Sequence, residues 1–423
     1  MALFPQEVYL VEAPERIMET IHNIGILYYM PRNGGGTYQL TENVMCVLAD
    51  YAAARPGYRI HLFYNTMELK DLENIKLKFP TFLLHKIGKS LKIYSSLLKR
   101  MFVAFPPVIC LLRHCFPLNW IANQHNIDLM ILAGITFEAS FYKRRQITLF
   151  TDIAHVFYPH FPELAANGEL RRRNILFKYG VRYADQLVVE SNQLRSDTVK
   201  YYAADPTKIA ILPQTVSQTL VASETSAEDA ESAEFRRTLP KSYFFYPAQL
   251  WEHKNHIKLL NALKILIGEF PNLHLILVGS RQRGDQVIFD MIEKLGLSNN
   301  VIWMGYVCDA FIRILYKNTC ALVKPGYIGP TNIPTLEAFY YGCPAIISDI
   351  PGAREQTEDA ALLFEPDSYQ DMAAKMRMVL TDEALRRALI LKGYERLGSL
   401  GYQSYRKTFF DILDKNFVSI IHE

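Results

Sequence analysis

The sequence has few of the features that mark several common protein classes. Its six cysteines form no C-x-x-C pair, and no group of cysteines and histidines has the spacing of a zinc site. The formal net charge is only +3 over 423 residues, which gives no overall bias toward nucleic acid. We therefore expect free thiols in a reducing cytoplasm, no metal site and no nucleic-acid partner.

Long hydrophobic runs are also missing. The longest apolar stretch, 101–112, is far shorter than the roughly 20 residues that cross a bilayer, and Pro106 and Pro107 interrupt it. Residues 1–22 carry four glutamates and no apolar region after a basic start, so we expect no secretory signal. These patterns argue against an integral membrane protein.

Acidic residues are absent from one long segment, 74–127, although eight lysines and arginines fall within it. Its large apolar residues recur at helical spacing at positions 83, 84, 87, 91, 94 and 98. The pattern predicts a basic amphipathic helix, which either lies on an anionic membrane surface or packs inside a domain with a solvated basic face. We keep 76–113 as a surface for peripheral binding at the inner face of the cell membrane.

The length of the chain favours two domains, and both halves alternate short apolar runs with helical patterns. Such alternation predicts an α/β fold with a parallel sheet in each domain, and ligands that bind where the strands end. A cleft between the domains is then the expected active site. The predicted strands are 24–29, 59–64, 129–133, 147–150, 186–190, 243–246, 273–278, 301–303, 321–323, 345–348 and 362–364.

Domain limits follow from a composition change near the middle of the chain. Residues 221–240 include a run of small and acidic residues with few large apolar ones, which is typical of a linker or exposed loop. We expect a first domain over 1–220 and a second domain over 241–401. A final amphipathic helix, 402–423, is expected to pack back on the first domain.

The segment 324–344 carries the strongest chemical signal. The strand 321–323 runs into a glycine- and proline-rich loop, and a helix opens near Pro334, which suits a first helical turn. Glycines allow close backbone approach, and a helix N-terminus favours anions such as a diphosphate. Glu337 could hold ribose hydroxyls there or only cap the helix.

A second segment, PAQLWEHKN over 247–255, follows the strand 243–246. Lys254 within it stands at the same edge of the sheet as the predicted anion site, where it can neutralise phosphate charge. A lone lysine after a strand is more often a solvated surface charge. The assignment of Lys254 to phosphate binding therefore depends on the neighbouring loop.

The order of these motifs, followed by LILVGS, GPTNIPTLEAFYYGCPAI and SDIPGAREQ, resembles the retaining family-4 glycosyltransferases of the GT-B fold, in particular those that build bacterial surface polysaccharides. The resemblance covers mainly 243–397. It implies two Rossmann-like domains, with Lys254 on the donor phosphates and Glu337 on the donor ribose. It also implies that His155 lies beside the donor sugar and that Ser191 lines the cleft.

The sequence departs from that family at two positions. Gly329 stands where the family often has the first glutamate of an E-x7-E pair, and Gln249 replaces an arginine that precedes the lysine. We expect backbone groups of the loop to bind the donor in place of that glutamate. The loop residues concerned are Gly329, Pro330, Thr331 and Asn332.

Further site residues are expected from the glycine cluster 33–37 and from the end of the strand 147–150. In the family that glycine loop faces the donor phosphates, which makes Gly35 and Gly36 donor-binding candidates. Gly279 is expected in the pocket for the base. Asp152 and His160 are acceptor-side candidates, and Glu163 is a weaker one.

The resemblance implies retaining transfer of a sugar from a nucleoside diphosphate to a lipid-linked or growing O-antigen or capsule-type acceptor. Cofactors and metals are not expected, since no D-x-D motif ends a predicted strand. A nucleotide-sugar epimerase or phosphorylase and a catalytically silent nucleotide-sugar-binding protein are the alternatives. The sequence does not distinguish GDP, UDP or dTDP donors, nor does it indicate an oligomeric state.

Overall fold

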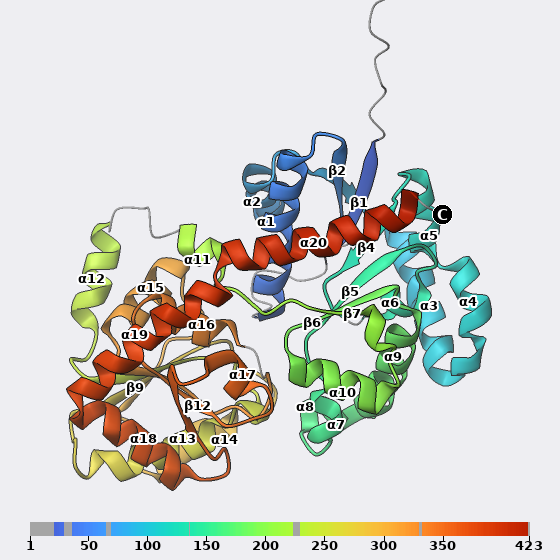
Figure 1. Ribbon diagram of the computed structural model, residues 1–423. Helices are drawn as coiled ribbons and strands as arrows, with labels where there is room; N and C mark the ends of the chain where they lie inside the picture. The colour runs from blue at the N-terminus through green and yellow to red at the C-terminus, as the bar shows by residue number, and fades with distance from the viewer. Residues whose placement is uncertain are drawn as a thin grey trace, which may run out of the picture.

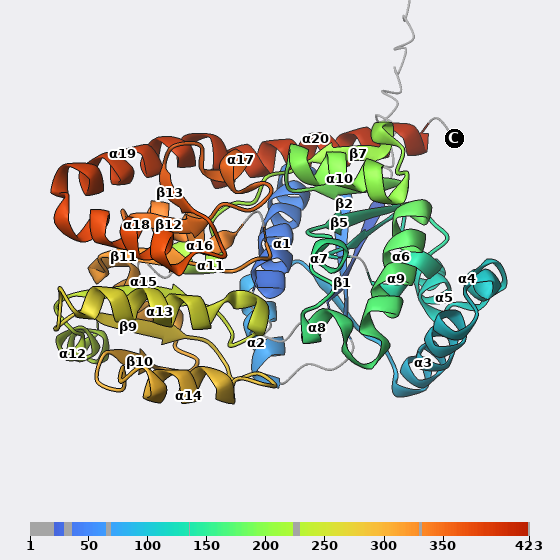
Figure 2. The same cartoon turned by 90° about the horizontal axis from the view of Figure 1, so that it is seen from below.

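The computed structural model describes residues 21–28, 36–64, 69–134, 136–222, 229–329 and 332–421. They form two lobes, each built on one parallel β-sheet with helices on both faces (Figures 1 and 2). The two α/β domains expected from the alternating pattern are therefore confirmed.

The first lobe contains a seven-stranded sheet in the order β3-β2-β1-β4-β5-β6-β7, and every pairing in it is parallel. Its strands are β1 (His22–Tyr28), β2 (Tyr58–Tyr64), β3 (Leu83–Lys86), β4 (Leu129–Leu132), β5 (Gln146–Phe150), β6 (Gln186–Val189) and β7 (Ile209–Ile211). Its helices are α1 (Gly36–Ala54), α2 (Leu69–Lys78), α3 (Lys89–Ala104), α4 (Ile109–Cys115), α5 (Pro117–Gln124), α6 (Phe137–Phe141), α7 (Ala154–Phe157), α8 (Pro162–Ala165), α9 (Glu169–Tyr183), α10 (Asn192–Tyr202) and α11 (Gln218–Ala222).

The second lobe contains a six-stranded parallel sheet in the order β10-β9-β8-β11-β12-β13. Its strands are β8 (Tyr243–Pro247), β9 (His274–Val278), β10 (Val301–Trp303), β11 (Ala321–Lys324), β12 (Ala345–Ser348) and β13 (Ala361–Phe364). Its helices are α12 (Ala230–Thr238), α13 (His256–Ile267), α14 (Gln286–Lys294), α15 (Asp309–Asn318), α16 (Ile333–Tyr340), α17 (Ala353–Thr357), α18 (Tyr369–Thr381), α19 (Glu383–Leu400) and α20 (Tyr402–Ile421).

Both sheets are buried on two faces, and this explains why their strands read as continuous apolar runs. In β8, Phe244 and Tyr246 point into the core beneath α13 and α18, whereas Tyr243 and Phe245 point into the core beneath α15 and α16. The first sheet alternates in the same way. Parallel strands covered on both sides leave their carboxyl edges as the natural places for a site.

Two strands of the first sheet, β3 and β7, were not predicted from the sequence. The apolar spacing predicted a helix that includes positions 83, 84 and 87, but Leu83–Lys86 is the edge strand β3 paired with β2, and helix α3 begins only at Lys89. That part of the helix prediction is wrong, because a short apolar run fits either period. β7 is only three residues long and was not predicted.

Helix α20 runs from the second lobe across to the first, as both views show (Figures 1 and 2). Its apolar face, which includes Phe409 and Leu413, is buried in the same core as α1 and the first sheet. Asp414 on α20 accepts hydrogen bonds from Tyr51 at 2.7 Å and from Arg55 at 2.6 Å. The last described helix therefore ties the two lobes together.

Part of the stretch expected to be a linker is helical, since α12 covers 230–238 and Asp229 caps it by accepting from the Ser232 N–H at 2.8 Å. Residues 223–228 lie outside the described chain. Among the described helices, none combines the length and the apolar character needed to cross a membrane.

Candidate functional site

A cleft of about 450 Å³ lies between the two lobes. The segments that line it follow strands of both sheets or open the helices after them, so the carboxyl edges of the two sheets face each other across it. Most of the residues predicted for the site lie in its wall: Gly36, Asp152, Gln249, Lys254, Gly279, Gly329, Asn332 and Glu337.

Lys254 is held in place by its own backbone and by the residue that follows. The Lys254 carbonyl accepts a hydrogen bond from the Tyr246 hydroxyl at 3.0 Å. Asn255 adopts the left-handed conformation, and its amide donates to the carbonyls of Pro325 and Pro366, each at 3.0 Å. Burial lowers the pKa of Lys254. The lysine is thus anchored beside the loop that follows β11.

Glu337 lies on α16, is 3% exposed and bridges the two lobes. One carboxylate oxygen accepts from the Tyr316 hydroxyl at 2.9 Å, and the other accepts from the Gln39 side-chain amide of α1 at 2.9 Å. Burial raises the pKa of Glu337 to about 7, although both hydrogen bonds favour the charged form. The carboxylate is therefore poised between its two protonation states near neutral pH.

Gly279 is required by the way two loops meet. Its φ is +148°, and a Cβ there would lie 2.2 Å from the carbonyl oxygen of Ala248. The loop after β9 consequently presses directly on the loop after β8, which precedes Lys254. Only glycine fits this position without moving the wall of the cleft.

The loop after β11 is held by Gln356 of α17. The Asn332 N–H donates to the Gln356 side-chain oxygen at 3.1 Å, and the Gln356 amide donates back to the Asn332 carbonyl at 3.1 Å. The backbone donor expected of Asn332 is therefore already used within the protein. Gly329 has a φ of +91° and its carbonyl accepts from the Asn332 side chain. Pro330, Thr331 and Gly35 lie outside the described residues.

Three predicted residues lie elsewhere. His155 is 1% exposed, packs on Phe177 and shares a 2.9 Å hydrogen bond with the Tyr202 hydroxyl, so in this structure it belongs to the core of the first lobe. Ser191 is buried and caps α10 by accepting from the Leu194 N–H. His160 is exposed and lies against Phe161. None of the three is among the described residues that line the cleft.

Glu190, a polar residue of the cleft wall, was not predicted. Glu190 directly follows β6, is 8% exposed and accepts from the Gln214 amide at 2.7 Å. Burial holds its pKa well above the usual range, and the nearby charge of Asp152 adds to the effect. The sequence feature that could have indicated Glu190 is its place at the carboxyl end of an apolar run, one residue before Ser191.

Lys324 was also missed as a functional residue. It ends β11, is 4% exposed, and its ammonium donates to the Gly329 carbonyl at 3.1 Å. Burial, together with the nearby positive charge of Lys254, holds the pKa of Lys324 well below its usual range. Two lysines therefore lie close together at the carboxyl edge of the second sheet.

A second bridge between the lobes lies beside Lys254. Glu163 on α8 accepts a hydrogen bond from the His253 N–H at 2.9 Å and contacts the His253 ring as well. Burial alone would raise the pKa of Glu163, but the contacts with His253 lower it. Glu163 is thus a structural contact that sets the position of the residue before Lys254.

Comparison with protein families gives a match for the second lobe. The family model described as "Glycosyl transferases group 1" matches residues 228–396. Lys254, Lys324 and Glu337 all fall inside this segment.

Two curated relatives are mannosyltransferases. Serotype-specific mannosyltransferase WbdA of Escherichia coli is 27% identical over 237 residues, which are 55% of this chain and 28% of WbdA. O-antigen chain mannosyltransferase RfbU of Salmonella typhimurium is 24% identical over 204 residues, which are 48% of this chain and 53% of RfbU. The matches therefore span about half or less of the relatives' own length.

Solved structures match over nearly the whole chain. Sucrose-phosphate synthase from Thermosynechococcus elongatus superimposes with a TM-score of 0.70 at 17% identity, covering 94% of this chain and 100% of that one. Anabaena HepE, solved with UDP and glucose, gives a TM-score of 0.66 at 16% identity, covering 93% and 100%. Residues 228–396 thus match a glycosyltransferase group 1 family model, and the two lobes together have the GT-B fold.

Proposed function

We propose that the protein transfers a hexose, with mannose the first candidate, from a nucleoside diphosphate to a growing or lipid-linked cell-surface polysaccharide, with retention of anomeric configuration. The observation that carries this is one cleft that places Lys254 and Glu337 within the glycosyltransferase group 1 domain, opposite polar groups of the other lobe. The choice of mannose rests on the names of WbdA and RfbU. HepE, solved with UDP and glucose, supports a nucleotide-sugar site on this fold.

The cleft offers a different group for each part of a nucleotide sugar. Glu337 accepts hydrogen bonds from the ribose, while Lys254 stabilises the charge that grows on the departing diphosphate. On the opposite wall, Asp152 and Glu190 hold acceptor hydroxyls, and the raised pKa of Glu190 keeps it able to donate. A phosphate oxygen of the leaving group takes the acceptor proton as the new bond forms on the same face.

Transfer is tested with GDP-, UDP- and dTDP-hexoses, first without and then with lipid-linked or oligosaccharide acceptors. We expect sugar transfer from one donor class, an unchanged anomeric configuration by NMR, and thermal stabilisation by the matching nucleoside diphosphate. At 100 times its dissociation constant such a ligand stabilises by about 2.7 kcal/mol. Conversion of the donor without acceptor would instead indicate an epimerase, and binding without any conversion a silent nucleotide-sugar-binding protein.

A second cation for the diphosphate is available in Lys324. Gln249 occupies the position where the resembling family often has an arginine, so one positive charge is missing from the loop before Lys254. Lys324 lies behind Gly329, which lines the cleft, and is electrostatically coupled to Lys254. We propose that its charge compensates for Gln249.

Removing either lysine should weaken catalysis. We expect Lys254→Ala to lower kcat/KM about 100-fold and Lys324→Met about 10-fold, because each removes positive charge near the diphosphate. Lys258→Met is the matched control, since Lys258 pairs with Asp367 and does not line the cleft as described. Affinity for a nucleoside diphosphate should fall in both variants while affinity for the nucleoside alone stays the same. Equal losses for both ligands would contradict the charge role.

Glu337 should make donor binding depend on pH. Its pKa near 7 in the empty cleft means that the carboxyl is partly protonated there, and ribose hydroxyls favour the charged form. Donor affinity measured by calorimetry should therefore increase as pH rises from 6 to 8, a range in which the diphosphate of a nucleotide sugar does not titrate.

The matched variant is Glu337→Gln, which keeps the shape but cannot ionise. We expect it to bind the donor about tenfold or more weakly at pH 8, since hydrogen bonds to a charged group are worth about 1.5–3 kcal/mol. Its affinity should change little between pH 6 and 8. A slope as steep as that of the unchanged protein would assign the pH dependence to another group.

The segment 76–113 supports peripheral membrane binding more by its apolar surface than by its charge. Lys78 pairs with Glu42, Lys99 pairs with Glu138, and Arg113 donates to the Tyr142 carbonyl, so these three cations are engaged within the protein. The arm formed by α3, α4 and α5 lies at the outer edge of the first lobe (Figure 2). It exposes large apolar side chains, namely Ile93, Leu97, Met101, Phe105, Leu111 and Trp120.

We propose that this arm inserts into the surface of an anionic membrane, where the acceptor resides. Ile93→Ser combined with Leu97→Ser should lower the vesicle-bound fraction at least about tenfold, because a buried large aliphatic side chain is worth about 1.5–3 kcal/mol. Leu391→Ser, at an exposed position of the second lobe, is the control. Sedimentation with neutral and anionic vesicles measures the effect, and failure of the unchanged protein to sediment with either would rule the arm out.

A further inference from the structure

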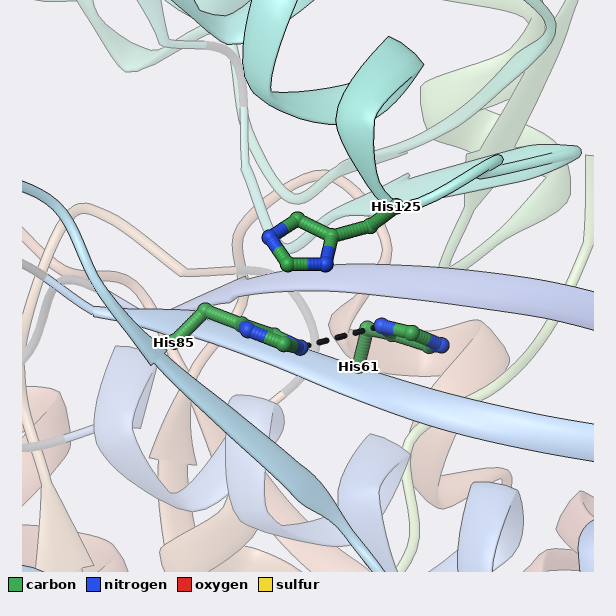
Figure 3. A group of neighbouring side chains, drawn as sticks. All are labelled: His61, His85 and His125. Atoms are coloured by element: carbon green, nitrogen blue, oxygen red, sulfur yellow. Dashed lines mark hydrogen bonds between the residues drawn. The ribbon is translucent and has the colours of Figure 1, made fainter.

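Three histidines converge at a place away from the cleft (Figure 3). His61 lies on β2, His85 lies on the edge strand β3, and His125 directly follows α5. One ring nitrogen of each lies within 4.8 Å of the others. None of them is among the described residues that line the cleft, so the cluster is separate from the proposed donor site.

The hydrogen bonds around His61 fix which nitrogen can bind a metal. The Asn23 amide nitrogen donates to the Asn126 carbonyl at 3.2 Å, which leaves the Asn23 side-chain oxygen facing His61 Nε2 at 3.1 Å. Because that oxygen only accepts, Nε2 of His61 carries the hydrogen. Nδ1 therefore has its lone pair directed at His85 Nε2, which lies 3.0 Å away.

This arrangement matches the way metal-binding histidines are usually oriented. A ligating imidazole commonly donates its other N–H to an oxygen acceptor, which fixes the ring and its tautomer, and Asn23 does this for His61. Ligands of a tetrahedral zinc with Zn–N bonds of about 2.1 Å lie roughly 3.4 Å apart, close to the 3.0 Å between His61 and His85. Transfer of the His85 hydrogen from Nε2 to Nδ1, a change of tautomer, would leave Nδ1 of His61 and Nε2 of His85 free to bind.

Neighbouring aromatic rings enclose the cluster on one side. The His125 ring lies 3.9 Å from that of His85 between centroids, and Phe63 covers His61 and His85 on the strand side. His85 and His125 are only partly buried, which leaves access for an ion and a fourth ligand.

We propose that His61, His85 and His125 form a site for a divalent zinc ion with a water molecule as the fourth ligand. Three imidazoles from separate elements suit zinc better than magnesium or calcium, which prefer oxygen ligands. The ion would clip the edge strand β3 to β2 and to the end of α5. It would therefore stabilise the base of the arm that we propose to meet the membrane, without taking part in transfer.

The test uses the full chain without an affinity tag, treated with a chelator and dialysed. Zinc is titrated against a chromophoric competitor, and cobalt is added separately because its visible absorption bands report four-coordinate geometry. We expect one zinc per chain, a dissociation constant at or below the micromolar range, and a higher Tm with the metal. Absence of saturable one-to-one binding would overturn the proposal.

Variants assign the ligands. His85→Ala and His125→Ala, at partly buried positions, should each weaken zinc binding by at least about 100-fold, more than loss of an orienting partner usually costs. His274→Ala, in the second lobe, should bind as the unchanged chain does. Circular dichroism checks that each variant is folded. X-ray absorption of the zinc-loaded unchanged protein should show three imidazoles, and fewer than three would contradict the site even if a variant fails to fold.

Discussion

Helix α20 joins the two lobes by returning from the second lobe to the first. Its buried face completes the core beneath α1, and Asp414 receives hydrogen bonds from Tyr51 and Arg55. At the other end of the helix, Tyr402 and Arg406 contact Asp50 of α1. This packing sets the lobes with their carboxyl edges opposed, and the contacts of Gln39 with Glu337 and of Glu163 with His253 then bridge the cleft.

Burial makes the charged forms of three groups in and beside the cleft unfavourable, and a bound ligand can offset this desolvation. Burial lowers the pKa of Lys254 and Lys324 and raises that of Glu337, so all three groups are disfavoured in their charged forms while the cleft is empty. A diphosphate would supply the opposite charge to the lysines, and ribose hydroxyls would supply donors to the carboxylate. The same burial that is unfavourable in the empty protein strengthens these contacts when they form.

Much of the fold could be predicted from the sequence, because buried parallel strands leave continuous apolar runs separated by helical patterns. Lys254 and Glu337 could be singled out for the same reason, since each follows soon after a clear strand. The differences between expectation and structure concern the direction of side chains rather than their position along the chain. Glu190 and Asp152 face the cleft, whereas Ser191 caps a helix and His155 turns into the core. Neighbouring residues of one loop point in different directions, and the spacing of apolar residues in the sequence does not predict which of them faces the cleft.

The histidine cluster was not predicted for another reason. Its three members lie on separate elements, which the order of the strands in the sheet brings together. Local spacing detects metal sites whose ligands share a turn or a helix, and these do not. The segment 76–113 was predicted to present a basic surface, but Lys78, Lys99 and Arg113 contact other residues of the protein. In both cases the deciding information lies in contacts between residues that are distant along the chain.

The candidate donor groups lie in the second lobe, whereas the other features lie in the first lobe, and this distribution suggests different roles for the two lobes. The glycosyltransferase group 1 match covers 228–396, which holds both lysines and Glu337, so the proposed donor chemistry lies in the part of the chain that a family shares. Glu190, the histidine cluster and the apolar arm all lie in the first lobe, outside that match. In the proposed reaction the second lobe binds the diphosphate and the ribose, which leaves the first lobe to fit the acceptor glycan. We therefore expect specificity for the acceptor to depend on the first lobe, with Asp152 and Glu190 as the groups nearest the transferred sugar.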